Sequence, residues 1–194
     1  MLVKIPIMED DIKTAVEVLR KGGVILYPTD TVWGIGCDAT NPDAVKRVYG
    51  IKKRADNKSM LVLVDGLAML ERYVDTVPEV AYSIIELSEK PVTIIYDKGI
   101  GLAPNLMGQD GSVGVRVTAE IFSKELCRRF RKPIVSTSAN LSGEPSAVVF
   151  DDIKDEIVNQ VDYVVKYRQD DVEPKTPSSV IKLKANGEVK ILRN

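Results

Sequence analysis

Histidine is absent from this chain of 194 residues. Its absence excludes a Ser-His-Asp or Cys-His catalytic set and the commonest zinc sites. It also removes the side chain that most often acts as a general base near neutral pH. Any chemistry must therefore rely on lysine, arginine, serine, threonine, asparagine and carboxylates.

Cysteine and long apolar runs are scarce as well. The two cysteines, Cys37 and Cys127, form neither a C-x-x-C pair nor a disulfide framework. No apolar run approaches the ~20 residues that a membrane span requires. The N-terminal segment MLVKIPIMEDDIK turns acidic where a signal peptide needs a long apolar stretch. We therefore expect a soluble, cytoplasmic protein with no membrane partner.

The overall charge is nearly balanced, with 27 basic and 28 acidic residues. With only 6% aromatic residues, the chain lacks the broad basic and stacking surface of general RNA binders. A chain of this length forms one domain that buries roughly 70% of its unfolded surface. We expect residues 1–194 to form a single domain.

Short β-branched runs alternate with helical patterns, which predicts an α/β fold: one twisted mixed sheet flanked by helices. The sequence NG at Asn186 and Gly187 favours a hairpin with a type I′ turn. Helices are expected around 12–19, from Pro42 behind an Asn41 cap, and near 77–88, 119–130 and 153–158. The predicted strands are LVKI, VILY, MLVLV, VTIIY, SVGVRV, PIVST, YVV and SSVIKL.

A local cluster of positive charge, IKKRADNKSM at 51–60, lies at the end of the helix that begins at Pro42. Taken alone, such a cluster is explained by a solvated helix end whose cations complement the helix dipole. Three further stretches favour a binding site instead. Each carries polar or charged groups beside a predicted buried strand, where ligand sites of α/β folds lie. They are YPTDTVWGIG, DGSVGVRV and VSTSANLSGEPS.

These stretches together resemble one known family. The segments GGVILYPTDTVWGIGCDATN, KKRADNK, SVGVRV, STSANLSGEPS and TPSSVIKL resemble, in order and spacing, the YrdC-like L-threonylcarbamoyladenylate synthases. The resemblance runs from about 21 to 193. Its most specific part pairs K-x-R and a following lysine with S-x-N. It implies a YrdC-like fold with a concave basic cleft.

The resemblance implies an enzyme, a nucleotidyltransferase that forms threonylcarbamoyl-AMP and pyrophosphate from L-threonine, bicarbonate or CO2, and ATP. ATP would enter as a substrate with Mg²⁺, without a permanent cofactor or a protein-ligated metal. The product would pass to the tRNA threonylcarbamoyl transferase complex, for modification of the adenosine beside the anticodon, and weak tRNA binding would be possible. These anionic reactants need positioning and charge stabilisation, which do not require histidine.

The resemblance also implies roles for individual residues. The arginine of the SVGVRV segment suits a bidentate grip on the threonine carboxylate. The implied catalytic residues are Lys52, Arg54, Lys58, Ser138 and Asn140. The implied ATP-binding residues are Arg54, Lys58, Ser112, Ser138, Ser146 and Arg193. The implied threonine-binding residues are Thr31, Arg116, Ser136 and Ser178.

Some positions depart from the family pattern. Trp33 replaces the usual tyrosine, Leu63 stands where a histidine is frequent, and Ala55 and Ser59 replace prolines that brace the basic loop. Two alternatives stay open: a non-catalytic RNA-binding module, and a paralogue that acts on another carbamoyl or nucleotide substrate. We expect Ser138 and Asn140 to project into the nucleotide cleft.

Overall fold

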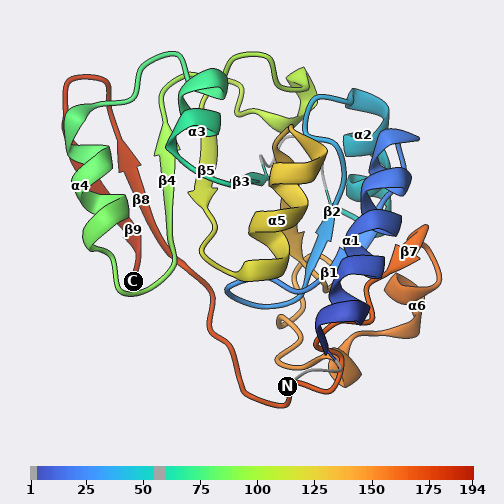
Figure 1. Ribbon diagram of the computed structural model, residues 1–194. Helices are drawn as coiled ribbons and strands as arrows, with labels where there is room; N and C mark the ends of the chain where they lie inside the picture. Colours follow the sequence, from blue (N-terminus) through green and yellow to red (C-terminus); the bar gives the residue numbers. More distant parts are fainter. Residues whose placement is uncertain (1–3, 55–59) are drawn as a thin grey trace.

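A twisted sheet organises the molecule, and helices α1, α3, α4 and α5 lie on one of its faces (Figure 1). The computed structural model describes residues 4–54 and 60–194. The helices are α1 (Lys4–Arg20), α2 (Pro42–Ile51), α3 (Leu67–Tyr73), α4 (Glu79–Leu87), α5 (Ile121–Phe130) and α6 (Asp155–Val158). Single 3₁₀ turns occur at Pro104–Leu106 and Phe150–Asp152.

In the described part of the chain, nine strands form this sheet in the order β7-β1-β2-β6-β3-β5-β4-β8-β9. Three neighbouring pairs, β1 with β7, β3 with β5 and β4 with β8, are parallel, and the remaining pairs are antiparallel. The predicted mixed α/β sheet is therefore confirmed. The strands are β1 (Ile25–Tyr27), β2 (Gly34–Gly36), β3 (Leu61–Val64), β4 (Val92–Tyr96), β5 (Val113–Val117), β6 (Ile134–Ser138), β7 (Tyr163–Val164), β8 (Ser179–Leu183) and β9 (Val189–Arg193).

Alternation along the strands separates the core from the opposite face of the sheet. In β5, Val113 and Val115 are buried in the core, whereas Gly114 and Arg116 line a cavity. In β4, Ile94 is buried in the core, and its neighbours Thr93 and Ile95 line the same cavity. Successive side chains of a strand point to opposite faces, so the helices cover one face and the cavity lies on the other.

Two local predictions are wrong. The strand expected at LVKI overlaps the start of α1 at Lys4, and its first two residues lie outside the described range. The NG hairpin exists, but Gly187 has a positive φ of 87° and Asn186 does not. Because a type I′ turn needs a positive φ at both central positions, the turn is instead a type I turn followed by a glycine bulge. Gly187 N accordingly donates to Lys184 O.

Strand β2, which is not among the strands predicted from the sequence, packs its glycines against β1 and β6. A Cβ at Gly36 would lie 2.6 Å from Tyr27 Cε1 and 2.7 Å from the Val135 carbonyl oxygen. The carbonyl belongs to the paired backbone of β6, so it has little freedom to move. This close approach explains why the segment reads GIG and not as an ordinary apolar strand.

We expect Gly36→Ala to lower the free energy of unfolding by about 1 to 3 kcal/mol, since the added methyl overpacks the β1–β2–β6 junction. Gly50→Ala is the matched control, because a Cβ there meets nothing within 4 Å. Gly50 lies inside α2, where alanine is favoured over glycine by roughly 0.5 to 1 kcal/mol. Urea unfolding of both variants measures the two effects, and a Gly36→Ala protein as stable as wild type would contradict the packing argument.

Candidate active site

The three consecutive cations at the end of α2 leave the helix in different directions. The helix ends with Lys53 in the left-handed region at φ 49°, and the Arg54 amide donates to the Tyr49 carbonyl. The Lys53 amide donates to the Gly50 carbonyl, which completes a Schellman motif. This fixed backbone buries Lys52, leaves Lys53 exposed beside Glu156 and directs Arg54 to the cavity. The cluster is therefore not a uniformly solvated helix end.

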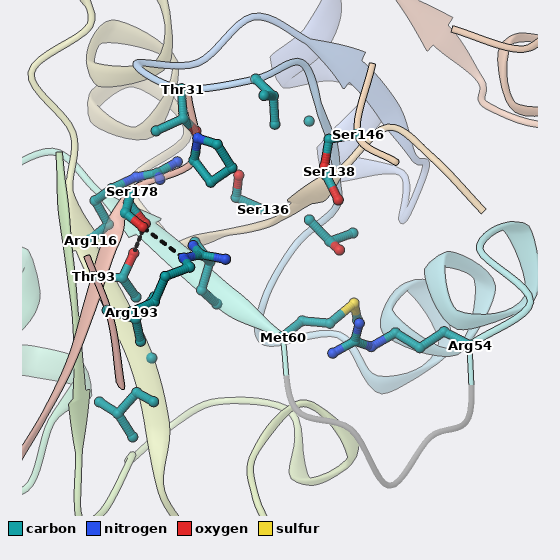
Figure 2. A pocket seen from close by; sticks show the side chains of 18 residues that line it. Thr31, Arg54, Met60, Thr93, Arg116, Ser136, Ser138, Ser146, Ser178 and Arg193 are labelled. Carbon is teal, nitrogen blue, oxygen red and sulfur yellow. Dashed lines mark hydrogen bonds between the residues drawn. The ribbon is translucent and has the colours of Figure 1, made fainter. Parts of the chain in front are cut away.

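The cavity on the open face of the sheet has a volume of about 300 Å³. Figure 2 shows Arg54 extending from the end of α2 toward Met60, at the opposite side from Arg116 and Arg193. Among the described residues that line the cavity, the three arginines are the charged groups, and no carboxylate accompanies them. The cavity brings together eight of the predicted site residues: Thr31, Arg54, Arg116, Ser136, Ser138, Ser146, Ser178 and Arg193.

Arg116 is held on β5 with only 3% of its surface exposed. Its Nε lies 3.1 Å from Asp30 Oδ1, but the angle is too poor for a hydrogen bond, so the pair is a Coulombic contact. Burial raises the pKa of the Asp30 carboxyl, and Arg116 opposes that shift. Burial also lowers the pKa of Arg116. A guanidinium in this position is anchored on one side and faces the cavity on the other.

The loop between β1 and β2 presents a pair of threonine hydroxyls. Thr29 Oγ1 donates to the Val32 carbonyl at 2.8 Å and accepts from the Thr31 amide at 3.0 Å. The two hydroxyl oxygens lie 3.1 Å apart. Because Thr29 has already used its single proton, Thr31 is the donor between them. The Thr31 oxygen therefore keeps acceptor capacity toward the cavity.

At the Arg193 end of the cavity, a short hydrogen-bond chain joins β4 and β9 to Ser178, the residue before β8 (Figure 2). Thr93 Oγ1 of β4 lies 2.8 Å from Ser178 Oγ, and Arg193 Nε donates to the Ser178 carbonyl at 3.0 Å. Thr93 is buried and lines the cavity, yet the sequence analysis did not single it out. Its only signal in the sequence is one hydroxyl inside the apolar run VTIIY.

Three of the predicted residues that the structure describes, Lys52, Ser112 and Asn140, do not line this cavity. Ser112 lies in the turn before β5, where its amide donates to Asp110. Lys52 and Asn140 contact each other, and the Asn140 amide donates to the Glu144 carbonyl within a turn. Asn140 was expected in the nucleotide cleft, but it lines a second cavity, which shares Ser146 with the first. Lys58 lies outside the described residues, as do Ala55 and Ser59. The catalytic roles of these residues stay predictions.

Trp33 and Leu63, two described positions that depart from the family pattern, are well packed. The rings of Trp33 and Phe150 lie 4.9 Å apart between their centroids, at 57°. Leu63 is fully buried and pairs with Arg116 across β3 and β5. Over the described ranges 4–54 and 60–194, no group of three or more Cys, Asp or Glu side chains is placed to hold a metal ion. None of the helices described is long and apolar enough to cross a bilayer.

Burial lowers the pKa of Lys52. The pKa of the ammonium falls from its ordinary 10.5 to about 8, and the nearby Arg54 charge adds to the shift. Between these two values the unfolded chain binds more protons than the folded one, so the contribution of Lys52 to stability rises with pH.

We therefore expect wild type to gain up to about 3 kcal/mol of stability relative to Lys52→Met between pH 7.5 and pH 10.5. Urea unfolding of both proteins across that range measures the difference. A stability difference that stays constant with pH would show that Lys52 titrates normally.

The site thus consists of a cavity on the sheet face opposite α1, α3, α4 and α5, lined by arginine, serine and threonine side chains. The chain belongs to the Sua5/YciO/YrdC family, whose sequence model, described as "Telomere recombination", matches residues 17–194.

Individual relatives match most of the chain. It is 35% identical over 184 residues to a threonylcarbamoyl-AMP synthase of Pseudoalteromonas translucida, covering 93% of this chain and 97% of that protein. It is 40% identical over 137 residues to a threonylcarbamoyl-AMP synthase of Stenotrophomonas maltophilia, covering 69% and 74%.

Solved structures share the fold. Escherichia coli YciO superposes with a TM-score of 0.79 at 28% identity, covering 94% of this chain and 88% of that one. Sua5 of P. abyssi, in complex with L-threonine, superposes with a TM-score of 0.79 at 25% identity, over 89% of this chain. This chain spans only 50% of that Sua5 chain.

Proposed function

We propose that this protein is an L-threonylcarbamoyladenylate synthase. It would join L-threonine, bicarbonate or CO2, and ATP into threonylcarbamoyl-AMP and pyrophosphate. The single observation that carries the proposal is one cavity with two separate cationic ends, Arg54 at one and Arg116 with Arg193 at the other. The names of the relatives favour this reading over an RNA-binding module or a paralogue with another substrate.

The reaction has two steps: carbamate formation makes a C–N bond, and adenylation makes one O–P bond while it breaks another. The free amine of threonine attacks the carbon of CO2, loses a proton and becomes a carbamate. A carbamate oxygen then attacks the α-phosphorus of ATP, and the bond from that phosphorus to the bridging oxygen breaks to release pyrophosphate. When bicarbonate is the source, one water is lost before or during carbamate formation. Each step needs aligned anions more than a strong base.

The lining residues suit these tasks. The Arg116 fork matches a carboxylate, and the hydroxyls of Thr31, Ser136 and Ser178 lie in the same cavity for the remaining polar groups of threonine. Arg54, Ser138 and Ser146 line the same cavity as fixed donors for phosphate oxygens. ATP would arrive as its Mg²⁺ complex, with the ion held by phosphates and water.

The domain organisation, the location and the acceptor of the product are proposed from the same relatives. Residues 1–194 would act as one domain in the cytoplasm and hand the product to a tRNA threonylcarbamoyl transferase complex. Lys58, Ser112 and Arg193 stay candidate ATP contacts in this proposal, although Arg193 lies at the Arg116 end of the cavity. The cleft as a whole would be basic.

Pyrophosphate release from ATP tests the function. We expect release to require both L-threonine and bicarbonate, and L-serine to support a rate at least about 10-fold lower, because a missing methyl contact costs roughly 1 to 3 kcal/mol. A coupled pyrophosphate assay with each substrate omitted in turn measures this. Equal release without any amino acid would remove the synthase assignment.

A further inference from the structure

Lys52 is enclosed beneath the turn that follows β6, which we call the 138–146 turn. Its side chain is among the largest fully buried ones in the described residues, with 2% exposed. The ammonium donates to the carbonyl of Ser138, to the Asn140 carbonyl at 2.7 Å and to Asn140 Oδ1 at 3.4 Å. A lysine ammonium has three protons, and these three oxygens match them.

The same turn is tied to Lys52 through the backbone and closed by Asn140. The Ser142 amide donates to the Lys52 carbonyl at 2.8 Å. Asn140 Nδ2 donates to the Leu141 carbonyl at 3.0 Å and to the Glu144 carbonyl at 2.7 Å. Both polar atoms of the Asn140 side chain are therefore engaged, Oδ1 with Lys52 and Nδ2 within the turn, and neither Lys52 nor Asn140 lines the cavity that holds the arginines.

The residues that do line the cavity from this turn are Ser138 at its start and Ser146 at its end. We propose that Lys52 and Asn140 are a positioning pair that fixes the 138–146 turn and so aims the Ser138 and Ser146 hydroxyls, without touching either substrate. The catalytic set then divides into two halves: Arg54 and Ser138 face the reactants, and Lys52 and Asn140 hold them in place. This inference rests on the proposed function only for the identity of the ligand, ATP.

The positive charge on Lys52 contributes to fixing the 138–146 turn. The charged groups around it are engaged elsewhere or repel it: Arg54 lowers its pKa, Lys53 pairs with Glu156, and Glu144 pairs with Lys154 at 2.6 Å. With its pKa near 8, the ammonium loses a proton in mildly alkaline solution, and the amine then has two protons for three oxygens. Activity should fall there while the stability contribution of Lys52 rises.

A double-mutant cycle in the full chain tests whether the two residues act as a unit. We expect Lys52→Met and Asn140→Ala each to lower kcat/KM for ATP by at least about 10-fold. The kcat/KM of the double variant should lie within about threefold of that of the less active single variant. Lys53→Met removes the adjacent, exposed cation and is the matched control, expected to keep wild-type activity. Multiplied losses in the double variant would mean independent contacts and would overturn the pair.

The alkaline limb of the pH profile provides a readout that a purely structural role would not move. Wild type should lose kcat/KM as pH rises through about 8. Lys52→Arg, which keeps its charge, should retain its own activity to higher pH. If kcat/KM fell at the same pH in wild type and Lys52→Arg, the proposed role of the Lys52 charge would be overturned.

Amine labelling of the wild-type protein keeps the inference testable if the variants fail to fold or if pyrophosphate is not released. With acetic anhydride and mass spectrometry, Lys52 should react far more slowly than the exposed Lys53, at the same rate with and without MgATP. Labelling of Lys52 as fast as Lys53 in the free protein, with protection by MgATP, would show that it contacts the nucleotide and would overturn the proposal.

Discussion

Replacing Arg116 by lysine is expected to raise the KM for L-threonine on the order of 10²-fold and to leave ATP affinity nearly unchanged. The guanidinium offers a planar fork to a carboxylate, and lysine offers a single point charge on a shorter reach. Arg116 is 3% exposed, so water cannot substitute for the lost contact. Losing one charge-assisted hydrogen bond at such a site costs about 1.5 to 3 kcal/mol. Threonine-dependent kinetics and calorimetry with ATP alone measure the two affinities.

Lysine is a better probe of Arg116 than alanine because of the neighbouring carboxylate. Arg116→Ala would leave Asp30 buried without its cation, which costs about 3 to 5 kcal/mol and confuses folding with binding. Arg128→Lys is the control, since Arg128 is 63% exposed and pairs with Glu125 on the surface of α5. Parallel loss of threonine and ATP binding in Arg116→Lys would mean that the threonine end of the cavity is misassigned.

Arg54→Ala is expected to lower the turnover number by on the order of 10² or more. The Schellman motif fixes the Arg54 backbone, and its side chain lines the cavity at the end opposite Arg116. A fixed cation that meets charge developing on the phosphates stabilises the transition state more than the ground state. The loss should therefore appear in kcat at saturating substrates and be larger than the change in ATP affinity.

Lys53→Ala provides the comparison for Arg54→Ala, because it removes the same charge one residue earlier. Lys53 is 62% exposed and pairs with Glu156 outside the cavity, so its loss should leave turnover unchanged. Melting temperatures of both variants establish that they are folded. Normal turnover in a folded Arg54→Ala protein would return the basic cluster to the role of a solvated helix end.

Most strands and helices follow from local pattern, and the exceptions have physical causes. The Asn41 cap and Pro42 place the start of α2, and the Asn41 side chain accepts from the Asp43 and Ala44 amides as expected. Strand β2 could not be predicted, because GIG has a low β-propensity. It is a strand because its glycines let Tyr27 and the backbone of β6 approach closely. That contact joins segments about 100 residues apart and is not visible in a local window.

The site was predictable as a set of segments but not as a set of side-chain directions. The sequence indicated that Lys52, Arg54, Ser138 and Asn140 belong together. It could not show that a left-handed residue at Lys53 would send Lys52 inward and Arg54 to the cavity. Helix ends and turns decide such directions, and glycine, the usual residue at this position of a helix end, is replaced here by lysine.

The order of the strands has a consequence for how the protein acquires its site during synthesis. Gly34 of β2 pairs with Ser138 of β6, and Arg193 reaches the cavity from β9, at the edge of the sheet. A nascent chain that has emerged as far as α5 carries Thr31, Arg54 and Arg116 but neither β6 nor the β8–β9 hairpin. Pairings between such distant segments form late and slowly. The complete cavity therefore forms only after β9 has emerged, and until β6 pairs, β2 and β3 each keep an open edge that can pair with the wrong partner.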